Sequence, residues 1–226
     1  MNYIDFEKAL SPARLNRYLI ACNGNKLKAL ELYQLNIKLS QDFYAILSLF
    51  EVALRNSIDE HYKTHFNDNE WLKNQCLNTG FLNSPAFAIG RYKSRKKVDT
   101  AIRDLGVRYT HDKVVASISF GFWINLFAPM QFRLAGQNLH QIFSARPTGT
   151  KPRVLFNSLS LILDFRNRVA HHEPLCFNHL HQKNTAYALK HYNIIVEKTN
   201  WLGFASQDFF DGLDNVQSII TQIDLL

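Results

Sequence analysis

The chain has 226 residues, of which 46% are hydrophobic, so it can bury a sizeable core without disulfides or a structural metal. Lysine and arginine outnumber aspartate and glutamate by 26 to 19, and the net charge is +7. This basic balance favours an anionic partner such as nucleic acid, although charge alone does not identify one. The cysteines are few, widely spaced and without a CxxC pair, as is typical of reduced thiols in a cytosolic protein: Cys22, Cys76 and Cys176.

Neither a targeting segment nor a membrane span is predicted. The opening MNYIDFEKAL carries acidic residues and lacks the apolar core of a signal peptide. The most apolar later run, VVASISFGFWINLFAPM, is interrupted by polar residues and proline. It falls short of the ~18 uninterrupted apolar residues that a spanning helix needs. We therefore expect one cytoplasmic domain over residues 1–226, with no membrane contact.

The N-terminal half is predicted to be helical, because apolar residues recur every three or four positions and period-two strand patterns are absent. A helix is expected from Pro12, with Ser11 as its N-cap, and the NGN at 23–25 ends it. A long helical stretch follows from 26 to about 62, with a break expected within LYQLNIKLS, residues 32–40. Its apolar stripe consists of Leu39, Phe43, Ile46, Phe50, Ala53, Leu54 and Ile58.

The middle of the chain combines loops with shorter helices. Residues 66–85 are rich in asparagine and glycine and are predicted to be loop-like. A basic helix is expected within 84–106, followed by helical segments at 112–127 and 129–143. A dense aromatic group is expected to serve core or dimer packing rather than base stacking: Phe120, Phe122, Trp123 and Phe127.

The C-terminal part is also predicted to be helical, which makes the fold class all-α. One helix is expected from about 154 to 172, ended by Pro174, since a residue before proline avoids the helical conformation. A last long helix covers 184–200, and the tail from Phe204 is expected to be helical too. The buried face of the 154–172 helix should consist of Leu155, Leu159, Ile162, Phe165 and Val169.

The stretch FRNRVAHHEP, residues 165–174, concentrates the side chains that are best suited to chemistry. In an ideal helix Asn167 and His171 lie four apart on one face, and the long side chain of Arg166 can reach the same spot. Arginine offers forked donors to phosphate oxygens, and histidine can move a proton near neutral pH. The competing interpretation is that these side chains only cap helix carbonyls and meet water. Two neighbours have an open role, His172 and Glu173.

A second Arg-Asn pair, Arg55 and Asn56, precedes His61 and could complete a composite cleft, with Glu51 as an acidic partner. Residues six apart on a regular helix point about 120° away from each other, so His61 fits such a site less well. The alternative is a structural ion pair of Arg55 with Glu51 or with Asp59, each four residues away. We favour a structural role for His61 and keep the other three as possible contributors.

The run RYKSRKK, residues 91–97, is a candidate RNA-binding ridge in which cations hold phosphates and Tyr92 stacks on a base. A solvated helix face explains the same composition equally well. The cations in question are Arg91, Lys93, Arg95, Lys96 and Lys97.

No metal or other cofactor is predicted. Adjacent histidines on a helix point about 100° apart, and no CxxC or HExxH spacing supports zinc. The histidines that lie close together in sequence are His171, His172, His179 and His181.

LILDFRNRVAHHEPLC resembles the signature of the HEPN superfamily, in which an Arg, often followed by Asn, precedes a His on one helix. Arg166, Asn167 and His171 match it with four intervening residues. More narrowly, the chain resembles the bacterial abortive-infection (Abi, AbiD/AbiF-like) proteins over most of its length. The matching segments, in order, are LSPARLNRYL, ALELYQLNIKLSQDFYAILSLFEVALRNSI, SISFGFWINLF, FRNRVAHHEP and Trp201.

This resemblance implies a HEPN-like helical bundle with additional helices, and a metal-independent endoribonuclease acting in phage defence or as a toxin. It also implies RNA as the substrate and a homodimer whose motifs face each other. His171 would transfer protons, Arg166 would stabilise the transition state, and Asn167 would orient the imidazole or contact phosphate. The alternative is a noncatalytic helical module that binds RNA or protein in phage defence. A third hypothesis is a toxin that is held silent by a cognate antitoxin of RNA or protein.

Overall fold

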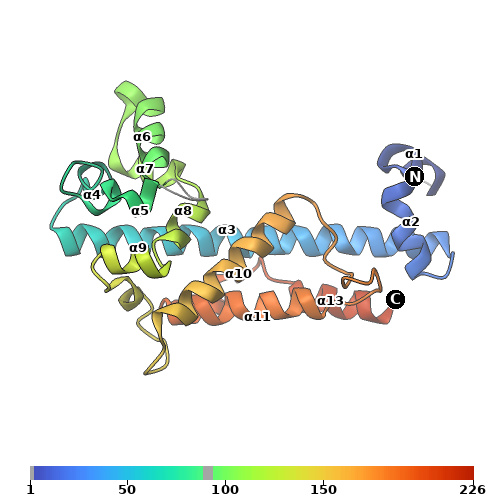
Figure 1. Cartoon of the computed structure of the whole chain (residues 1–226). Helices are drawn as coiled ribbons and strands as arrows, with labels where there is room; N and C mark the ends of the chain where they lie inside the picture. Colours follow the sequence, from blue (N-terminus) through green and yellow to red (C-terminus); the bar gives the residue numbers. More distant parts are fainter. Residues whose placement is uncertain (1–2, 89–93) are drawn as a thin grey trace. The chain divides into compact units, whose positions relative to one another are not determined.

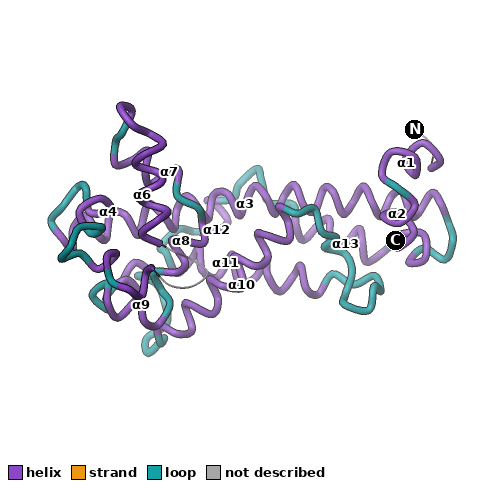
Figure 2. Tube along the Cα trace, turned by 45° about the horizontal axis from the view of Figure 1, so that its top comes forward, coloured by secondary structure: helices purple, strands orange, loops and turns teal. Residues whose placement is uncertain are grey.

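The computed structural model describes residues 3–88 and 94–226, and these residues form helices and connecting turns without a β-strand (Figure 1). Figure 2 shows the same described chain as helix and loop only. The all-α class is therefore confirmed. The chain forms two compact units, of which the first comprises Met1–Ser48, Phe165–Val196 and Ser206–Leu226, and the second Leu49–Asp164 and Glu197–Ala205. The single domain expected from the sequence stays a prediction.

The helices are of very unequal length. They are α1 (Tyr3–Leu10), α2 (Pro12–Ala21), α3 (Lys26–Phe66), α4 (Trp71–Asn74), α5 (Pro85–Ala88), α6 (Ser94–Leu105), α7 (His111–Ser117), α8 (Phe120–Asn125), α9 (Pro129–Leu134), α10 (Pro152–Ala170), α11 (Ala186–Trp201), α12 (Ser206–Phe209) and α13 (Val216–Leu225). Short 3₁₀ turns lie at Phe81–Asn83, Gly106–Arg108 and Leu139–Ile142. Among the described residues, none of these helices has the length and apolar character required to cross a bilayer.

Helix α3 runs unbroken for 41 residues, so the break expected within residues 32–40 is wrong. Two polar side chains of this segment make hydrogen bonds within the fold. The Asn36 side chain is buried and its Oδ1 accepts a hydrogen bond from the backbone N–H of Leu175 at 2.8 Å. Ser40 Oγ donates to the carbonyl of Asn36 at 2.9 Å. Because the segment contains neither glycine nor proline, nothing else interrupts the helix.

Several predicted boundaries are confirmed and others shift. Helix α2 begins at Pro12 as expected, but Ser11 adopts a φ of 75° and its side chain makes no cap hydrogen bond. The NGN segment ends α2, with Asn23 and Gly24 both at positive φ. The segment expected to be one helix at 112–127 is two, because Ile118 and the N-cap of α8 adopt extended backbone.

In the first unit, α13 packs antiparallel to the N-terminal part of α3. The Lys28 ammonium donates to the carbonyl of Leu226 at 3.1 Å, and the backbone N–H of Asn215 donates to the Asp42 carboxylate at 3.2 Å. Low-numbered residues of α3 thus meet the end of α13, and higher-numbered ones meet its beginning.

Phe165 fixes the C-terminal turn of α10 within the same unit. Its side chain is fully buried, with its ring centroid 4.6 Å from that of Phe43 and 4.6 Å from the stacked ring of His191. Since Phe165 directly precedes Arg166, this packing sets which face of α10 the following polar residues occupy. The predicted buried face of α10 and the predicted stripe of α3 are both buried.

The core of the second unit is strongly aromatic. Tyr62 packs on Trp71 with ring centroids 4.8 Å apart, and Phe66 stacks on Phe81 at 5.7 Å. The aromatic group of α8 and the residues after it is buried, which confirms core packing for Phe120, Phe122, Trp123 and Phe127.

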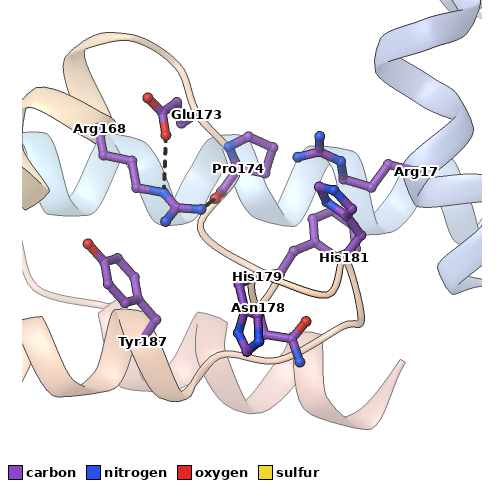
Figure 3. Close-up of a pocket in the computed structure, with 9 residues that line it drawn as sticks. Arg17, Arg168, Glu173, Pro174, Asn178, His179, His181 and Tyr187 are labelled. Atoms are coloured by element: carbon purple, nitrogen blue, oxygen red, sulfur yellow. Dashed lines mark hydrogen bonds and ion pairs between the residues drawn. The ribbon is translucent and has the colours of Figure 1, made fainter.

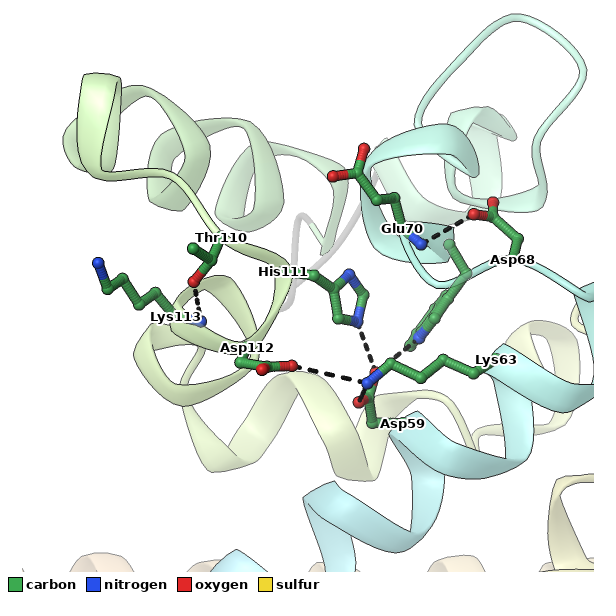
Figure 4. Close-up of polar contacts among 9 residues, drawn as sticks. Asp59, Lys63, Asp68, Glu70, Thr110, His111, Asp112 and Lys113 are labelled. Atoms are coloured by element: carbon green, nitrogen blue, oxygen red, sulfur yellow. Dashed lines mark hydrogen bonds and ion pairs between the residues drawn. The ribbon is translucent and has the colours of Figure 1, made fainter.

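A polar cluster around Asp59 lies inside this aromatic core (Figure 4). The Asp59 carboxylate accepts hydrogen bonds from Trp71 Nε1 at 2.8 Å and from His111 Nε2 at 2.7 Å, and it pairs with Lys63 at 2.7 Å. Burial by itself raises the pKa of Asp59, but the hydrogen bonds from His111, Lys63 and Trp71 outweigh it and hold that pKa below its ordinary value. The cluster is therefore a charged network that ties α3, α4 and α7 together.

Candidate functional site

The C-terminal end of α10 carries the predicted motif and has a defined cap. The helix ends at Ala170, two residues earlier than expected, because His172 adopts a left-handed φ of 55°. The backbone N–H of His172 donates to the carbonyl of Val169 at 3.0 Å, and the backbone N–H of Glu173 donates to the carbonyl of Arg168 at 3.1 Å. This pair of bonds is a Schellman cap, in which a left-handed residue closes the helix. A glycine usually occupies that position.

The cap predicts a gain in stability for His172→Gly. Glycine adopts positive φ without a steric cost, whereas an L-residue loses about 1–2 kcal/mol there. After allowing for the greater flexibility of unfolded glycine, we expect a stabilisation of up to about 1 kcal/mol in denaturant unfolding. His172→Val, which puts a β-branched side chain at the same φ, should destabilise instead. A destabilised His172→Gly protein would contradict this assignment of the cap.

The predicted catalytic residues lie around this cap. Arg166 and Asn167 are half-buried on the last turn of α10, while His171 is exposed just beyond it. The backbone N–H of His171 donates to the carbonyl of Asn167 at 2.9 Å, so the helical spacing of four is kept across the helix end. Arg14 of α2 donates from Nη2 to the carbonyl of His172 at 2.9 Å and anchors the segment that follows.

A pocket of about 610 Å³ lies within the first unit (Figure 3). Arg168 reaches it from α10, Arg17 from α2 and Tyr187 from α11. The loop after α10 supplies the rest of the lining, namely Glu173, Pro174, Phe177, Asn178, His179 and His181. Of the predicted site residues, only Glu173 is among those that line this pocket within the described chain.

Arg168 is held firmly at the wall of the pocket. Its Nη2 donates to the carbonyl of Pro174 at 2.7 Å, and its guanidinium lies 4.8 Å from the ring centroid of Tyr187. Its Nε lies 3.6 Å from the Glu173 carboxylate, which is an ion pair but too long for a hydrogen bond. Among the described residues, this buried Nε has no hydrogen-bond partner.

A tight turn presents the two histidines of the pocket. Asn178 Oδ1 accepts from the backbone N–H groups of Leu180 at 2.9 Å and Gln182 at 3.0 Å. His181 lies at a positive φ of 60°, and both His179 and His181 are exposed. Asparagine therefore shapes the loop from within, as in other Asx turns.

The second Arg-Asn pair belongs to the second unit. Arg55 is half-buried and donates from Nη1 to the carbonyl of Ala116 at 3.3 Å, while Asn56 is exposed and Glu51 is half-buried. Of the two ion pairs considered for Arg55, the one with Asp59 is not formed among the described contacts, since Asp59 binds Lys63 and His111. Whether these residues contribute to a cleft stays a prediction.

His61 is engaged in a polar network of the same unit. Its Nε2 lies 3.0 Å from Asn138 Oδ1, and Asn138 Nδ2 lies 2.9 Å from His65 Nδ1. The rings of His61 and His65 stack with centroids 6.1 Å apart. These contacts agree with the structural role favoured for His61.

The basic run is only partly within the described residues. Arg91 and Lys93 lie outside them, as does Tyr92. Arg95 and Lys96 are exposed, and Arg95 pairs with Asp99 at 3.5 Å and also contacts Asn83. Lys97 is half-buried and donates to Ser119 Oγ at 3.0 Å, and burial lowers its pKa. RNA binding by this run stays a prediction.

The thiols and possible metal ligands do not form a further site within the described chain. Cys22, Cys76 and Cys176 are free and buried, and burial raises the pKa of Cys76 and of Cys176 to about 12. Such thiols are poor nucleophiles at neutral pH. Residues 3–88 and 94–226 contain no group of three or more potential ligands arranged to hold a metal ion.

The residues that sequence reasoning missed are those contributed by other helices. Arg14 and Arg17 lie three apart on α2 and so share one face, a signal that could have drawn attention to them. Arg168 was visible inside the motif, four residues before His172. Nothing in the local pattern around Tyr187 indicates that it faces the same pocket.

The chain matches a family model described as Abi-like protein over residues 5–177. The matched range contains the Arg166, Asn167 and His171 motif, and ends before His179. Trp201, which contributed to the resemblance noted from the sequence, also lies beyond it. Comparisons with curated proteins and with solved structures gave no match. The chain belongs to the family of Abi-like proteins, and this membership indicates a role in phage defence.

Proposed function

We propose that this Abi-like protein is a metal-independent endoribonuclease of HEPN type, acting in abortive infection or as the toxin of a toxin–antitoxin pair. The observation that carries the proposal is the end of α10, where half-buried Arg166 and Asn167 precede an exposed His171 by five and four residues. A permanently charged guanidinium and a solvent-accessible imidazole on one helix end are groups that phosphoryl transfer at neutral pH can use.

The proposed reaction is cleavage of RNA through its own ribose. The 2′-oxygen attacks the adjacent phosphorus, the bond from phosphorus to the 5′-oxygen breaks, and a 2′,3′-cyclic phosphate and a 5′-hydroxyl result. His171 either takes the proton of the 2′-hydroxyl or supplies a proton to the leaving 5′-oxygen. Arg166 stabilises the charge that develops on the phosphorane, and Asn167 orients the imidazole or contacts phosphate. His172 and Glu173 are possible contributors.

The setting of His171 supports this role. Its exposure allows an RNA strand to reach the imidazole, while the cap of α10 and the bond from Arg14 fix the backbone on its C-terminal side. We further propose a homodimer that brings two such motifs together, and an antitoxin that restrains the activity.

A noncatalytic RNA-binding module is the second candidate. It is favoured by the pocket of the first unit, whose arginines and histidines could hold an anionic ligand without any reaction. Retention of RNA binding without cleavage under all conditions, including infection, would support this candidate over the nuclease.

The proposed nuclease mechanism can be tested by removing the 2′-hydroxyl from one position of the RNA substrate. Wild-type protein in EDTA should cleave an oligoribonucleotide at defined positions. Replacing the ribose on the 5′ side of one such position by 2′-deoxyribose should abolish cleavage there and leave the other positions unchanged. Continued cleavage at the deoxyribose would exclude attack by the 2′-oxygen and overturn the proposed mechanism.

A further inference from the structure

The pocket of the first unit gathers basic side chains from three separate elements, two of which supply a permanently charged guanidinium. Arg17 comes from α2, Arg168 from α10, and His179 and His181 from the loop that follows α10 (Figure 3). The two guanidinium groups stay charged at any physiological pH, whereas Glu173 brings one negative charge. Arginine donors in a fork match phosphate oxygens, so the charge balance favours an anionic ligand.

The walls of the pocket favour a ligand larger than a simple anion. Pro174, Phe177 and Tyr187 provide apolar and aromatic surface next to the charged groups. The guanidinium of Arg17 lies 5.8 Å from the ring centroid of Phe177, and Arg168 lies 4.8 Å from that of Tyr187. A volume of about 610 Å³ exceeds what a lone phosphate fills and lies in the range of small-molecule sites. Aromatic rings and flat guanidinium planes are the surfaces on which nucleobases stack.

Glu173 holds a place that a phosphate could take. Its carboxylate lies 3.6 Å from Arg168 Nε, beyond hydrogen-bond distance, and its side chain is 55% exposed. The Glu173 side chain can therefore turn into solvent at little cost. Arg168 would keep its position, because its bond to the Pro174 carbonyl at 2.7 Å does not depend on Glu173.

We propose that this pocket binds the phosphate of a nucleotide, with Arg17 and Arg168 as its phosphate-binding residues and Glu173 as the intramolecular anion that the phosphate displaces. The base or sugar then lies against Phe177 and Tyr187. The binding step does not require His171, so it goes beyond the proposed cleavage and can hold whether or not the chain is a nuclease.

The experiment is calorimetric titration of the full chain in EDTA with three probes: inorganic phosphate, adenosine monophosphate and a single-stranded 2′-O-methyl oligoribonucleotide. The 2′-O-methyl group blocks the proposed cleavage, so a failure of binding is separate from a failure of catalysis. The variants are Arg17→Ala, Arg17→Lys and Glu173→Gln. Arg153→Ala is the matched control, since Arg153 is an exposed arginine of α10 that does not line the pocket.

Arg17→Ala should weaken binding about tenfold or more, because a charge-assisted contact is lost. Arg17→Lys should weaken it less, since the charge remains without the fork. Glu173→Gln should strengthen binding several-fold, because the competing negative charge is removed. If Glu173 only held the loop in place, the same substitution would not strengthen binding. Arg153→Ala should bind like wild type.

The probes separate the two sources of the phosphate. Tight binding of adenosine monophosphate supports a free nucleotide, and Arg17-dependent binding of the oligonucleotide alone supports a nucleotide within an RNA strand. The proposal is overturned if no probe binds to wild-type protein, if Arg17→Ala and Arg153→Ala bind equally well, or if Glu173→Gln weakens binding.

Discussion

Replacing His171 by alanine should lower the rate of RNA cleavage by about 10²–10⁴-fold, which is what a positioned general acid or base contributes. Arg166→Ala should lower it by about 10²–10³-fold, because charge on the phosphorane loses its guanidinium. Arg166→Lys should cleave faster than Arg166→Ala but more slowly than wild type, since an ammonium retains the charge but not the forked geometry. Single-turnover cleavage of a labelled oligoribonucleotide in EDTA measures all three.

Two controls make this result specific. Arg153→Ala removes an exposed arginine from the same helix and should retain the wild-type rate. His171 is exposed, so His171→Ala should unfold at the wild-type temperature. Equal rates in wild type, His171→Ala and Arg166→Ala would mean that the cleavage comes from another source.

Asp59→Ala should destabilise the protein by about 3–5 kcal/mol, the largest effect on stability that we expect from a single substitution. The change leaves the buried N–H donors of Trp71 and His111 without a hydrogen-bond acceptor. It also removes the carboxylate closest to the ammonium of Lys63. Asp112→Ala is the matched control. Asp112 also faces Lys63, at 3.6 Å, but its side chain is 88% exposed, so its loss should change stability by less than about 0.5 kcal/mol. Equal effects of the two substitutions would contradict the importance of the buried cluster.

The same cluster predicts how stability depends on pH. Because the folded-state pKa of Asp59 is held below its ordinary value, its stabilisation is complete above the unfolded-state pKa of about 3.9. It disappears as pH falls through the lower, folded-state pKa. Denaturant unfolding between neutral and acidic pH should therefore show a loss of stability in wild type that is much smaller in Asp59→Ala. Parallel curves for the two proteins would contradict this linkage.

Much of the fold could be predicted because local signals decide it. The apolar stripe of α3, the NGN turn and the stop near Gly106 follow from side-chain periodicity and from residues that tolerate positive φ. The break expected in α3 is wrong: the segment contains neither glycine nor proline, and the buried Asn36 side chain accepts a hydrogen bond from Leu175, far away in the sequence. Tertiary contacts of this kind cannot be recognised from the neighbouring sequence.

The candidate site could be predicted only where its residues follow one another along a single helix. Spacing along α10 was sufficient to bring Arg166, Asn167 and His171 to one helix end. The exact end of that helix was not predictable, since histidine rather than glycine occupies the left-handed cap position. The pocket was missed because it combines side chains from α2, α10, α11 and a loop, and only packing of the whole first unit assembles it.

The most direct test of the central claim is the chemistry of the product ends. Purified wild-type protein and His171→Ala are incubated with the same RNA in EDTA, and the fragments are analysed by mass spectrometry. We expect 2′,3′-cyclic phosphate and 5′-hydroxyl ends from wild type and none above background from His171→Ala. Identical fragments from both proteins, or wild-type fragments ending in 5′-phosphate, would contradict a ribonuclease that acts through His171 and the ribose 2′-hydroxyl.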